Sequence, residues 1–476
     1  MAEETTGKKK SGWVGTAVRT ITPAIPLAIA LVHGAIAPKE PHTPRTPQPS
    51  QISQFSTGTT PISTLPAPSI ADCNSGVPCP MVAEGHPVTW WFVFKLNAKA
   101  FPGCGGGTRT CPFGGTPQTG KTYSQFGQQY VVASSDATSL QDGLTDCLGT
   151  TTKDPVGASF DEIYNGNYHY VIWNDQPYGD PKIAACTSSG NCDAPWGHSK
   201  GIVAWNDQGE GFVMQVSTPS WPAAGNAKFP RKTDGNTLGC VRDNDVTFSQ
   251  HFFALMLNKD DLVLVLKGLA NASVVTDPTN PQVVNNGGPA DVQALVSSLG
   301  TKSTSEALVE GTLSTGVLFM SKPSNLNVPP WQMVSSQLGG ASLRTATFWA
   351  KPEIPTTTDS TAPACWAESL GAPGPVAIAT SGSWRNTTFN LTGIPGANHS
   401  KIGVTTSGTT PYSIFGDENQ QGTLSGNCKS SQNGRGGTFY ALNNADLTQS
   451  ITSLIAGSTG GADTSSDAAT PADVTE

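Results

Sequence analysis

Charged residues are scarce in this chain of 476 residues, since Asp, Glu, Lys and Arg together make up 13% of it, against roughly a quarter in average proteins. The formal net charge is −8 at pH 7, so no overall positive field is available to hold a polyanion. Any nucleic-acid site must therefore be a local basic patch. Because acid protonates carboxylates, a DNA-handling protein of this composition should bind its substrate better at low pH.

Signatures of a metal site are missing as well. The ten cysteines do not show the repeated CxxC spacing of a zinc site, and no HExxH pattern of a metalloenzyme is present. We therefore expect neither a metal nor another cofactor. Two close pairs, Cys104 with Cys111 and Cys186 with Cys192, favour disulfides that close local loops in an oxidising compartment.

The apolar run near the N-terminus is a poor candidate for a membrane span. It extends from about Ile21 to Ala37 and is interrupted by Pro23 and Pro26, and about 17 residues with two prolines are short for crossing a bilayer. Basic residues precede the run, and it ends in small residues as a secretory signal does. We interpret residues 1–37 as a signal or targeting segment and expect no stable membrane partner.

Glycine and proline are plentiful by contrast, with 52 and 37 residues, which indicates many turns and loops between short elements. Residues 38–70 are rich in Pro, Ser and Thr and are predicted to form a solvated linker. A folded domain is predicted over residues 71–456, followed by a disordered tail over residues 457–476.

Apolar and aromatic runs typical of strands recur through this domain, many without the polar alternation of an exposed sheet. Helices are expected at Phe248–Leu269, at Asp291–Leu299 and at residues 443–455, where apolar side chains follow helical spacing. The predicted class is α/β, with sheets covered by helices. The predicted strands lie at residues 90–96, 130–133, 168–173, 201–205, 212–216, 316–320, 346–350, 376–379, 401–405 and 438–442.

One pattern occurs twice along the chain. His198-Ser199-Lys200 and His399-Ser400-Lys401 each place a histidine and a lysine two residues apart, just before an apolar run. In a strand, residues i and i+2 point to the same side roughly 6.6 Å apart, so a lysine accompanies each histidine on one face. A single HxK is more often a strand start beside a solvated lysine, whereas the matched pair favours catalysis.

Two such pairs suit chemistry at a phosphodiester. One neutral imidazole can attack phosphorus while the opposite imidazolium protonates the departing oxygen, and two lysines can hold the non-bridging oxygens. Mildly acid conditions favour one neutral and one charged imidazole. We predict His198, Lys200, His399 and Lys401 as catalytic residues, and the choice of nucleophile between the two histidines stays open.

The chain resembles the deoxyribonuclease II family, a group of double-HxK enzymes, from about residue 73 to residue 456. The likeness includes further segments in the same order as well as the two motifs. These segments are WFVFKL at 91–96, NDQP at 174–177, GF at 211–212, PSWP at 219–222, GNTLGC at 235–240, FWAK at 348–351, GDEN at 416–419 and RGGT at 435–438.

The resemblance implies an α/β, phospholipase D-like fold of two similar sheet-plus-helix halves, at about 71–270 and 271–456, around a pseudo-two-fold axis. It also implies a metal-independent acid endonuclease that leaves 3′-phosphate ends on its DNA substrate. The signal-like segment and the cysteines, together with the expected acid activity, predict a secreted or acidic lumenal location. We expect a monomeric pseudo-dimer, with a homodimer as the alternative.

The segment after the second motif supplies weaker candidates. Asp417, Asn419 and Arg435 match family positions and are candidate orienting groups, with a turn or a surface ion pair as the alternative. The Asn-Asp of the NDQP segment at 174–177 is interpreted as a strand-ending turn. By likeness to the family, the cysteine at position 73 is expected to pair with the cysteine at position 240.

A short basic stretch is the candidate DNA contact. Lys228, Arg231 and Lys232 lie close together in the sequence, and a solvated surface is the alternative. Tryptophans at positions 196, 205 and 221 could stack on bases, but aromatic residues in strand-rich sequence belong more often to the core.

Two other functions stay open. The first is another phospholipase D-like phosphodiesterase that acts on RNA or lipid, and the second is an inactive nucleic-acid-binding homologue. No short motif distinguishes a pocket for a 2′-hydroxyl or a lipid, so the choice of DNA rests on the family likeness. Cleavage of DNA at acid pH in the presence of EDTA separates these functions.

Overall fold

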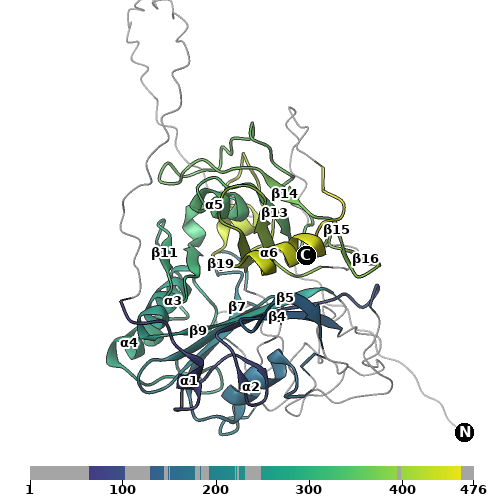
Figure 1. Ribbon diagram of the computed structural model, residues 1–476. Helices are drawn as coiled ribbons and strands as arrows, with labels where there is room; N and C mark the ends of the chain where they lie inside the picture. The colour runs from purple at the N-terminus through teal and green to yellow at the C-terminus, as the bar shows by residue number, and fades with distance from the viewer. Residues whose placement is uncertain are drawn as a thin grey trace, which may run out of the picture. The chain divides into compact units, whose positions relative to one another are not determined.

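Two large β-sheets, packed against each other and covered by helices, form the α/β fold of this chain (Figure 1). Within the part of the chain that the structure describes, no helix is long and apolar enough to span a membrane. The computed structural model describes residues 64–101, 129–143, 148–149, 151–176, 183, 192–219, 221, 225–230, 248–393 and 398–461.

The first sheet is buried along the whole length of its central strands. A sheet covered on both faces favours continuous apolar runs, which explains the sequence HFFALML in its middle. Its order is β10 (Val284–Asn285), β6 (His169–Asn174), β7 (Lys200–Trp205), β8 (Gly211–Val216), β9 (Gln250–Leu257), β3 (Trp90–Lys95), β4 (Tyr130–Ser134) and β5 (Ala137–Asp142).

The second sheet places its strands in a similar succession. Each HxK motif leads into a strand, β7 or β17, which lies between an earlier strand and its own hairpin partner. The order is β14 (Val376–Ile378), β13 (Leu343–Ala346), β17 (Ile402–Thr405), β18 (Tyr412–Gly416), β19 (Gly437–Asn443), β12 (Leu318–Lys322) and β11 (Val309–Thr312).

Helices and two small strand pairs complete the described chain. The strand pairs are β1 (Met81–Ala83) with β2 (His86–Pro87), and β15 (Ser381–Trp384) with β16 (Thr387–Asn390). The α-helices are α1 (Ile70–Cys73), α2 (Pro155–Asn165), α3 (Lys259–Asn271), α4 (Ala290–Ser298), α5 (Pro330–Gln337) and α6 (Ala445–Leu454).

Aromatic rings fill the space between the two sheets. Phe253 on β9 stacks on Phe415 of β18 with ring centroids 4.3 Å apart, and Phe92 on β3 stacks on the same ring at 4.7 Å. Tyr440 on β19 contacts Phe253 at 5.7 Å. These rings fix the inner faces of the sheets against each other, and the residues that alternate with them must point outward.

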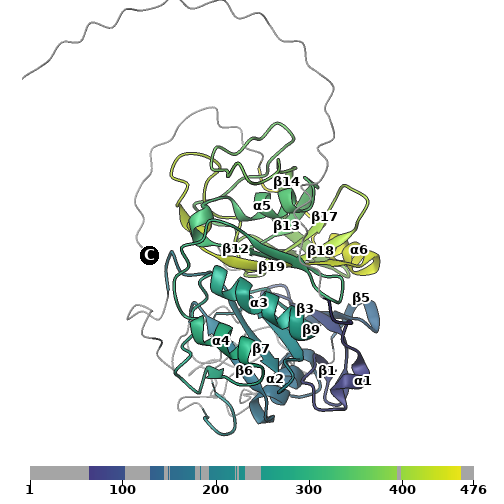
Figure 2. The ribbon, with the colours of Figure 1, turned by 90° about the vertical axis from the view of Figure 1, so that its left-hand side faces the viewer.

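Helices cover the outward faces. Phe252 of β9 contacts Trp221, and Trp221 packs on Phe160 of α2. On the other sheet, Phe439 of β19 contacts Trp331 of α5 with ring centroids 5.5 Å apart. Helices α2 and α5 thus lie on the outer faces of the two sheets, whereas α3 and α6 lie at the level between the sheets and contact both of them (Figures 1 and 2).

The central strand β9 corrects one expectation from the sequence. A helix is predicted over Phe248–Leu269, but residues 250–257 form β9, and α3 begins only at Lys259. Asn258 caps α3, because its side chain accepts the N–H of Asp261. Periodicity does not distinguish a buried strand from a buried helix in a short apolar run. This run is a strand because it is buried at the centre of the sheet.

Other predicted elements can be compared directly. The helix expected at 443–455 is confirmed as α6, with the Asn444 side chain accepting the Leu447 N–H at its start, and the helix expected at 291–299 is confirmed as α4. The strand expected at 346–350 is wrong, since β13 ends at Ala346. The chain leaves the sheet there, and the Thr347 hydroxyl accepts the Gln420 N–H instead.

Disulfides join two described pairs of cysteines. Cys73 pairs with Cys79, not with Cys240 as the family resemblance implies, and a short turn brings their Cα atoms to 5.8 Å. Cys365 pairs with Cys428 over 63 residues of sequence. Cys192 is also disulfide-bonded. The expected partners at positions 104, 111, 186 and 240 lie outside the described residues.

Candidate active site

The first HxK motif lies at the start of β7, where the chain enters the first sheet. Backbone contacts to the second sheet fix His198, whose N–H donates to the Gly436 carbonyl at 2.8 Å. Its ring Nδ1 lies 2.8 Å from the Asp417 carbonyl. Gly436 precedes β19 and Asp417 follows β18, so the ends of two strands of the second sheet hold this histidine.

The second HxK motif, which leads into the second sheet, is held by backbone carbonyls of the first sheet. The N–H of His399 donates to the Ser249 carbonyl at 2.8 Å, and its ring Nδ1 lies 3.2 Å from the Ser217 carbonyl. Ser249 precedes β9 and Ser217 follows β8, so both acceptors belong to the first sheet. Each histidine is thus held by the strand ends of the opposite sheet, at the border between the sheets.

The two motifs form one electrostatic site. Burial lowers the pKa of His198 well below its ordinary value, and Lys200, Arg435 and Lys401 lower it further. Burial likewise lowers the pKa of His399, and Lys401, Lys200 and His198 add to that shift. The lysines of both motifs therefore lower the pKa of each histidine, and both imidazoles are neutral at neutral pH.

The backbone contacts also select one tautomer of each neutral ring. A carbonyl oxygen only accepts hydrogen bonds, so Nδ1 of His198 and of His399 must carry the proton. The lone pair then lies on Nε2, the atom that would act as nucleophile or as base.

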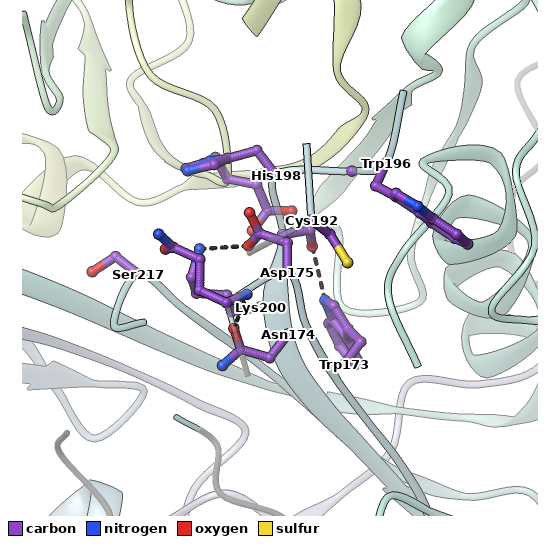
Figure 3. A network of polar contacts seen from close by, with 12 residues as sticks. Trp173, Asn174, Asp175, Cys192, Trp196, His198, Lys200 and Ser217 are labelled. Carbon is purple, nitrogen blue, oxygen red and sulfur yellow. Dashed lines mark hydrogen bonds and ion pairs between the residues drawn. The ribbon is translucent and has the colours of Figure 1, made fainter. Parts of the chain in front are cut away.

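Lys200 is held by a buried carboxylate. Its Nζ lies 2.6 Å from Oδ1 of Asp175, and the two side chains are only 2% and 1% exposed. The other oxygen of Asp175 lies 2.8 Å from the Arg435 guanidinium. Figure 3 shows Asp175 beside Lys200, with the ring of Trp196 turned away from both. Asp175 therefore bridges a lysine of the first sheet and an arginine that precedes β19.

Lys401 is held differently. Its Nζ donates to the carbonyl of His399 in its own motif at 2.6 Å, and its N–H donates to Nδ1 of His251 at 3.1 Å. Two aromatic rings flank the His399 imidazole, since Phe348 meets it edge-on with ring centroids 5.2 Å apart and Phe248 lies at 6.2 Å. The surroundings of His399 are thus more apolar than those of His198.

The weaker candidates fall into two groups. Asp417 and Arg435 belong to the site, because Asp417 supplies the carbonyl for His198, and Arg435 donates to the carbonyls of Trp196 and Gly197, the two residues that precede the first motif. Burial raises the pKa of the Asp417 carboxyl to about 6. Asn419 instead donates to Gln421, a neighbour in its own loop, at 2.8 Å.

Of the three predicted DNA contacts, only Lys228 is among the described residues. Lys228 is exposed, with its Nζ 5.4 Å from the centre of the Phe229 ring, whereas positions 231 and 232 are not among the described residues. Trp205 and Trp221 are fully buried core residues and cannot stack on bases. Trp196 is buried to 8% exposure and carries Lys302 over its ring at 5.3 Å.

Several site residues were not predicted from the sequence. Asp175 was interpreted as part of a turn, although a carboxylate at the end of an aromatic strand was the available signal. No local signal marked the four others, because their partners lie far away in the sequence. They are Ser217, Phe248, His251 and Phe348.

Histidine, cysteine and carboxylate side chains do not form a group that could hold a metal ion anywhere in the described ranges. The polar side chains that do converge are imidazoles, ammonium groups, one guanidinium and the carboxyl groups of Asp175 and Asp417. Such groups can bind an anion and can transfer protons to and from it.

Comparisons with known proteins agree with the motifs. The family model described as Deoxyribonuclease II matches residues 79–459. Deoxyribonuclease-2-alpha of Sus scrofa is 27% identical over 165 residues, which cover 33% of this chain and 38% of that protein. The aligned part thus spans well under half of this curated relative. Because the family model covers most of the chain, including both HxK motifs, the chain belongs to the deoxyribonuclease II family.

Proposed function

We propose that this protein is an endonuclease that hydrolyses DNA phosphodiester bonds through two histidines, without a divalent metal, and leaves 3′-phosphate ends. The observation that carries the proposal is the reciprocal hold on the two motifs, in which each histidine is fixed by the opposite sheet. Membership of the deoxyribonuclease II family supports DNA as the substrate.

In the proposed mechanism, Nε2 of one histidine attacks phosphorus in line, and the bond from phosphorus to the 5′-oxygen breaks. The other histidine, as imidazolium, gives its proton to the departing 5′-oxygen. Water then displaces the first histidine from phosphorus and gives a proton to the second, so the 3′-phosphate leaves and both rings return to their starting states. Lys200 and Lys401 stabilise the charge on the non-bridging oxygens during both steps.

The buried environment of the histidines supports activity in acid. Burial and the neighbouring cations lower the pKa of both rings, so the imidazolium that acts as general acid becomes populated only as the pH falls. The pair needs one proton between its two rings, which gives an optimum rather than a steady rise toward low pH.

We also infer that the chain is a pseudo-dimer of two related halves, at about 71–270 and 271–456, around a pseudo-two-fold axis as in phospholipase D-like folds. The central strands of the two sheets support this inference, because β6-β7-β8-β9-β3 corresponds to β13-β17-β18-β19-β12 in order. The short strand β10 joins the first sheet from the second half. A monomer with one composite site follows, with a homodimer as the alternative.

The disulfides Cys73–Cys79 and Cys365–Cys428 support a secreted or acidic lumenal location, because such bonds persist in oxidising compartments. An acidic compartment would also supply the imidazolium that the mechanism requires. Exposed Lys228, with Arg231 and Lys232, remains our candidate contact to the DNA backbone.

Incubation of the purified chain with plasmid DNA in EDTA, over pH 4 to 8, tests the proposal. We expect nicking and linearisation at acid pH and 3′-phosphate ends on labelled products. RNA and phospholipid are assayed in parallel, since a phosphodiesterase acting on either would use the same groups. Activity only with added divalent metal, activity on RNA or lipid alone, or an inactive protein that still binds DNA would each overturn it.

A further inference from the structure

We propose that Asp175 is a positioning residue for the nuclease site, because its carboxylate fixes Lys200 and Arg435 together and so holds the first motif in its working geometry. This inference rests on the proposed function, in which Lys200 binds the reacting phosphate. Asp175 follows β6, where Asn174 pairs with Lys200 across the sheet, so the strand pairing itself places the carboxylate beside the ammonium group.

The two oxygens of this carboxylate have separate partners. Oδ1 lies 2.6 Å from Nζ of Lys200, and Oδ2 lies 2.8 Å from the guanidinium of Arg435. The same guanidinium donates to the carbonyls of Cys192 and Gly197 at 2.6 and 3.0 Å. Asp175 and Arg435 therefore brace both Lys200 and the loop that leads into His198.

The second half has a different arrangement at the corresponding place. Ala346 pairs with Ile402, and extension of that register by one residue puts Thr347 opposite Lys401. The residue that follows, Phe348, takes the place of Asp175 and presents its ring to His399. Arg435, just before Gly436, likewise corresponds to Phe248, just before Ser249. An ion pair beside one histidine is thus replaced by two rings beside the other.

Charge gives Asp175 a second effect. The charged groups that act on His198 include Lys200, Lys401 and Arg435, with His399 and the Asp417 carboxyl also at the site. A carboxylate between Lys200 and Arg435 offsets part of their positive field. Its removal would make the imidazolium form of His198 less favourable, and the pKa of His198 would fall further.

A double-mutant cycle tests the positioning role. We expect Asp175→Asn to lower kcat by on the order of tenfold to 10²-fold with a smaller change in KM. Added to Lys200→Ala, it should cause a smaller further loss than in the parent, because the part of its effect that passes through Lys200 is already lost. Lys401 is the matched lysine of the other motif. Added to Lys401→Ala, Asp175→Asn should lower kcat by the same factor as it does in the parent. Full multiplication with both lysine variants would overturn the inference.

The pH profile supplies the readout that a merely structural role would not move. The limb of kcat/KM that belongs to His198 should shift to lower pH in Asp175→Asn, whichever role this histidine has. Asp154→Asn, which alters a buried carboxylate at the start of α2, is the control and should leave the limb in place. An unshifted limb in Asp175→Asn would overturn the inference.

Asp175→Glu keeps the charge and should retain more activity than Asp175→Asn, with a limb near that of the parent. If Asp175→Asn does not fold, Asp175→Glu, whose longer side chain displaces the carboxylate from its two partners, should still be less active than the control Asp154→Glu, and equal activity of these two variants overturns the inference. The proposed function is tested separately by Lys200→Ala alone. Loss of activity in Lys200→Ala but not in Asp175→Asn sinks only the positioning role, whereas full activity of Lys200→Ala sinks the proposed phosphate ligand.

Discussion

His198 and His399 are held by the same pattern of backbone contacts but stand in different surroundings. Each donates its N–H to the residue before a central strand of the opposite sheet, and each directs Nδ1 to the carbonyl that follows the neighbouring strand. Around His198 lie the ions Asp175 and Arg435, and around His399 lie the rings of Phe348 and Phe248. The backbone thus places the two imidazoles, and side chains make them different.

The difference has a chemical consequence. Burial and the two lysines lower the pKa of both histidines, and the positive charge of Arg435 adds to that shift at His198. Two imidazoles with different electrostatic surroundings can share one proton unequally, which a nucleophile and a general acid require.

The largest effect should come from the histidines. His198→Ala and His399→Ala should each lower turnover by at least ~10³-fold, because neither role can be filled by the remaining ring, and the double variant should be scarcely worse than either single one. DNA binding should survive both changes. Cleavage of duplex DNA at acid pH with EDTA measures turnover, and binding is measured by fluorescence anisotropy. Near-normal cleavage by either variant would contradict a two-histidine mechanism.

The two lysine variants should lose less activity than the histidine variants, and they should differ from each other in stability. Lys200→Ala and Lys401→Ala should each lower kcat by on the order of 10²-fold, because each removes a charged donor to the phosphoryl oxygens. Lys200→Ala should also lower the free energy of unfolding, but by less than the roughly 3–5 kcal/mol typical of a buried charge left unpaired, because the Asp175 carboxylate keeps its contact to Arg435. Lys401→Ala should be milder, since Nζ donates to a carbonyl. Equal losses in chemical denaturation would remove the distinction between the two lysines.

The residues that differ between the halves should have intermediate effects. Arg435→Lys should lower kcat by on the order of tenfold, because one ammonium group cannot reproduce contacts to Asp175 and several carbonyls. Phe248→Leu, at the corresponding place, keeps an apolar contact to His399 and should cost only a few-fold. Steady-state kinetics at the acid optimum compares the two, and the reverse order would argue against an ionic brace at His198.

The smallest effect concerns stability against pH. Burial raises the pKa of Asp417 to about 6, so its contribution is fully present below pH ~4 and is lost as the pH rises through 6. Asp417→Asn cannot ionise and should remove up to about 3 kcal/mol of this pH dependence. Ser217→Ala, at the corresponding place of the other half, should change stability equally at all pH values. Denaturation curves from pH 4 to 7 measure this pH dependence. If the stability of the parent and of Asp417→Asn changed with pH in parallel, the role assigned to the Asp417 carboxyl would be contradicted.

Local patterns in the sequence predicted much of this molecule. The final helix followed from apolar spacing and its asparagine cap, and the two HxK motifs were visible as a repeat. The helix expected over 248–269 was half wrong, because burial between two sheets, not periodicity, makes HFFALML a strand. Contacts such as Ser217 to His399 could not be predicted, since 182 residues separate the partners and only the meeting of the sheets joins them.

Asp175 shows most clearly what could not be predicted from the sequence. Its segment was interpreted as a turn after a strand, and the strand β6 does end at Asn174, just before Asp175. Its two ion-pair partners, 25 and 260 residues away, appear only when β6 pairs with β7 and the chain before β19 returns to the first motif. Pairing register and the packing of the halves, which a single sequence does not display, turn this residue into part of the site.

The stereochemistry of cleavage at phosphorus tests most directly that a histidine attacks the phosphodiester. The substrate is a DNA phosphorothioate of known configuration, cleaved at acid pH in ¹⁸O-labelled water with EDTA present. Each in-line displacement inverts phosphorus, so attack by histidine followed by attack by water should give a 3′-thiophosphate with retained configuration. Inversion would mean that water attacks the DNA directly, and it would contradict a histidine nucleophile.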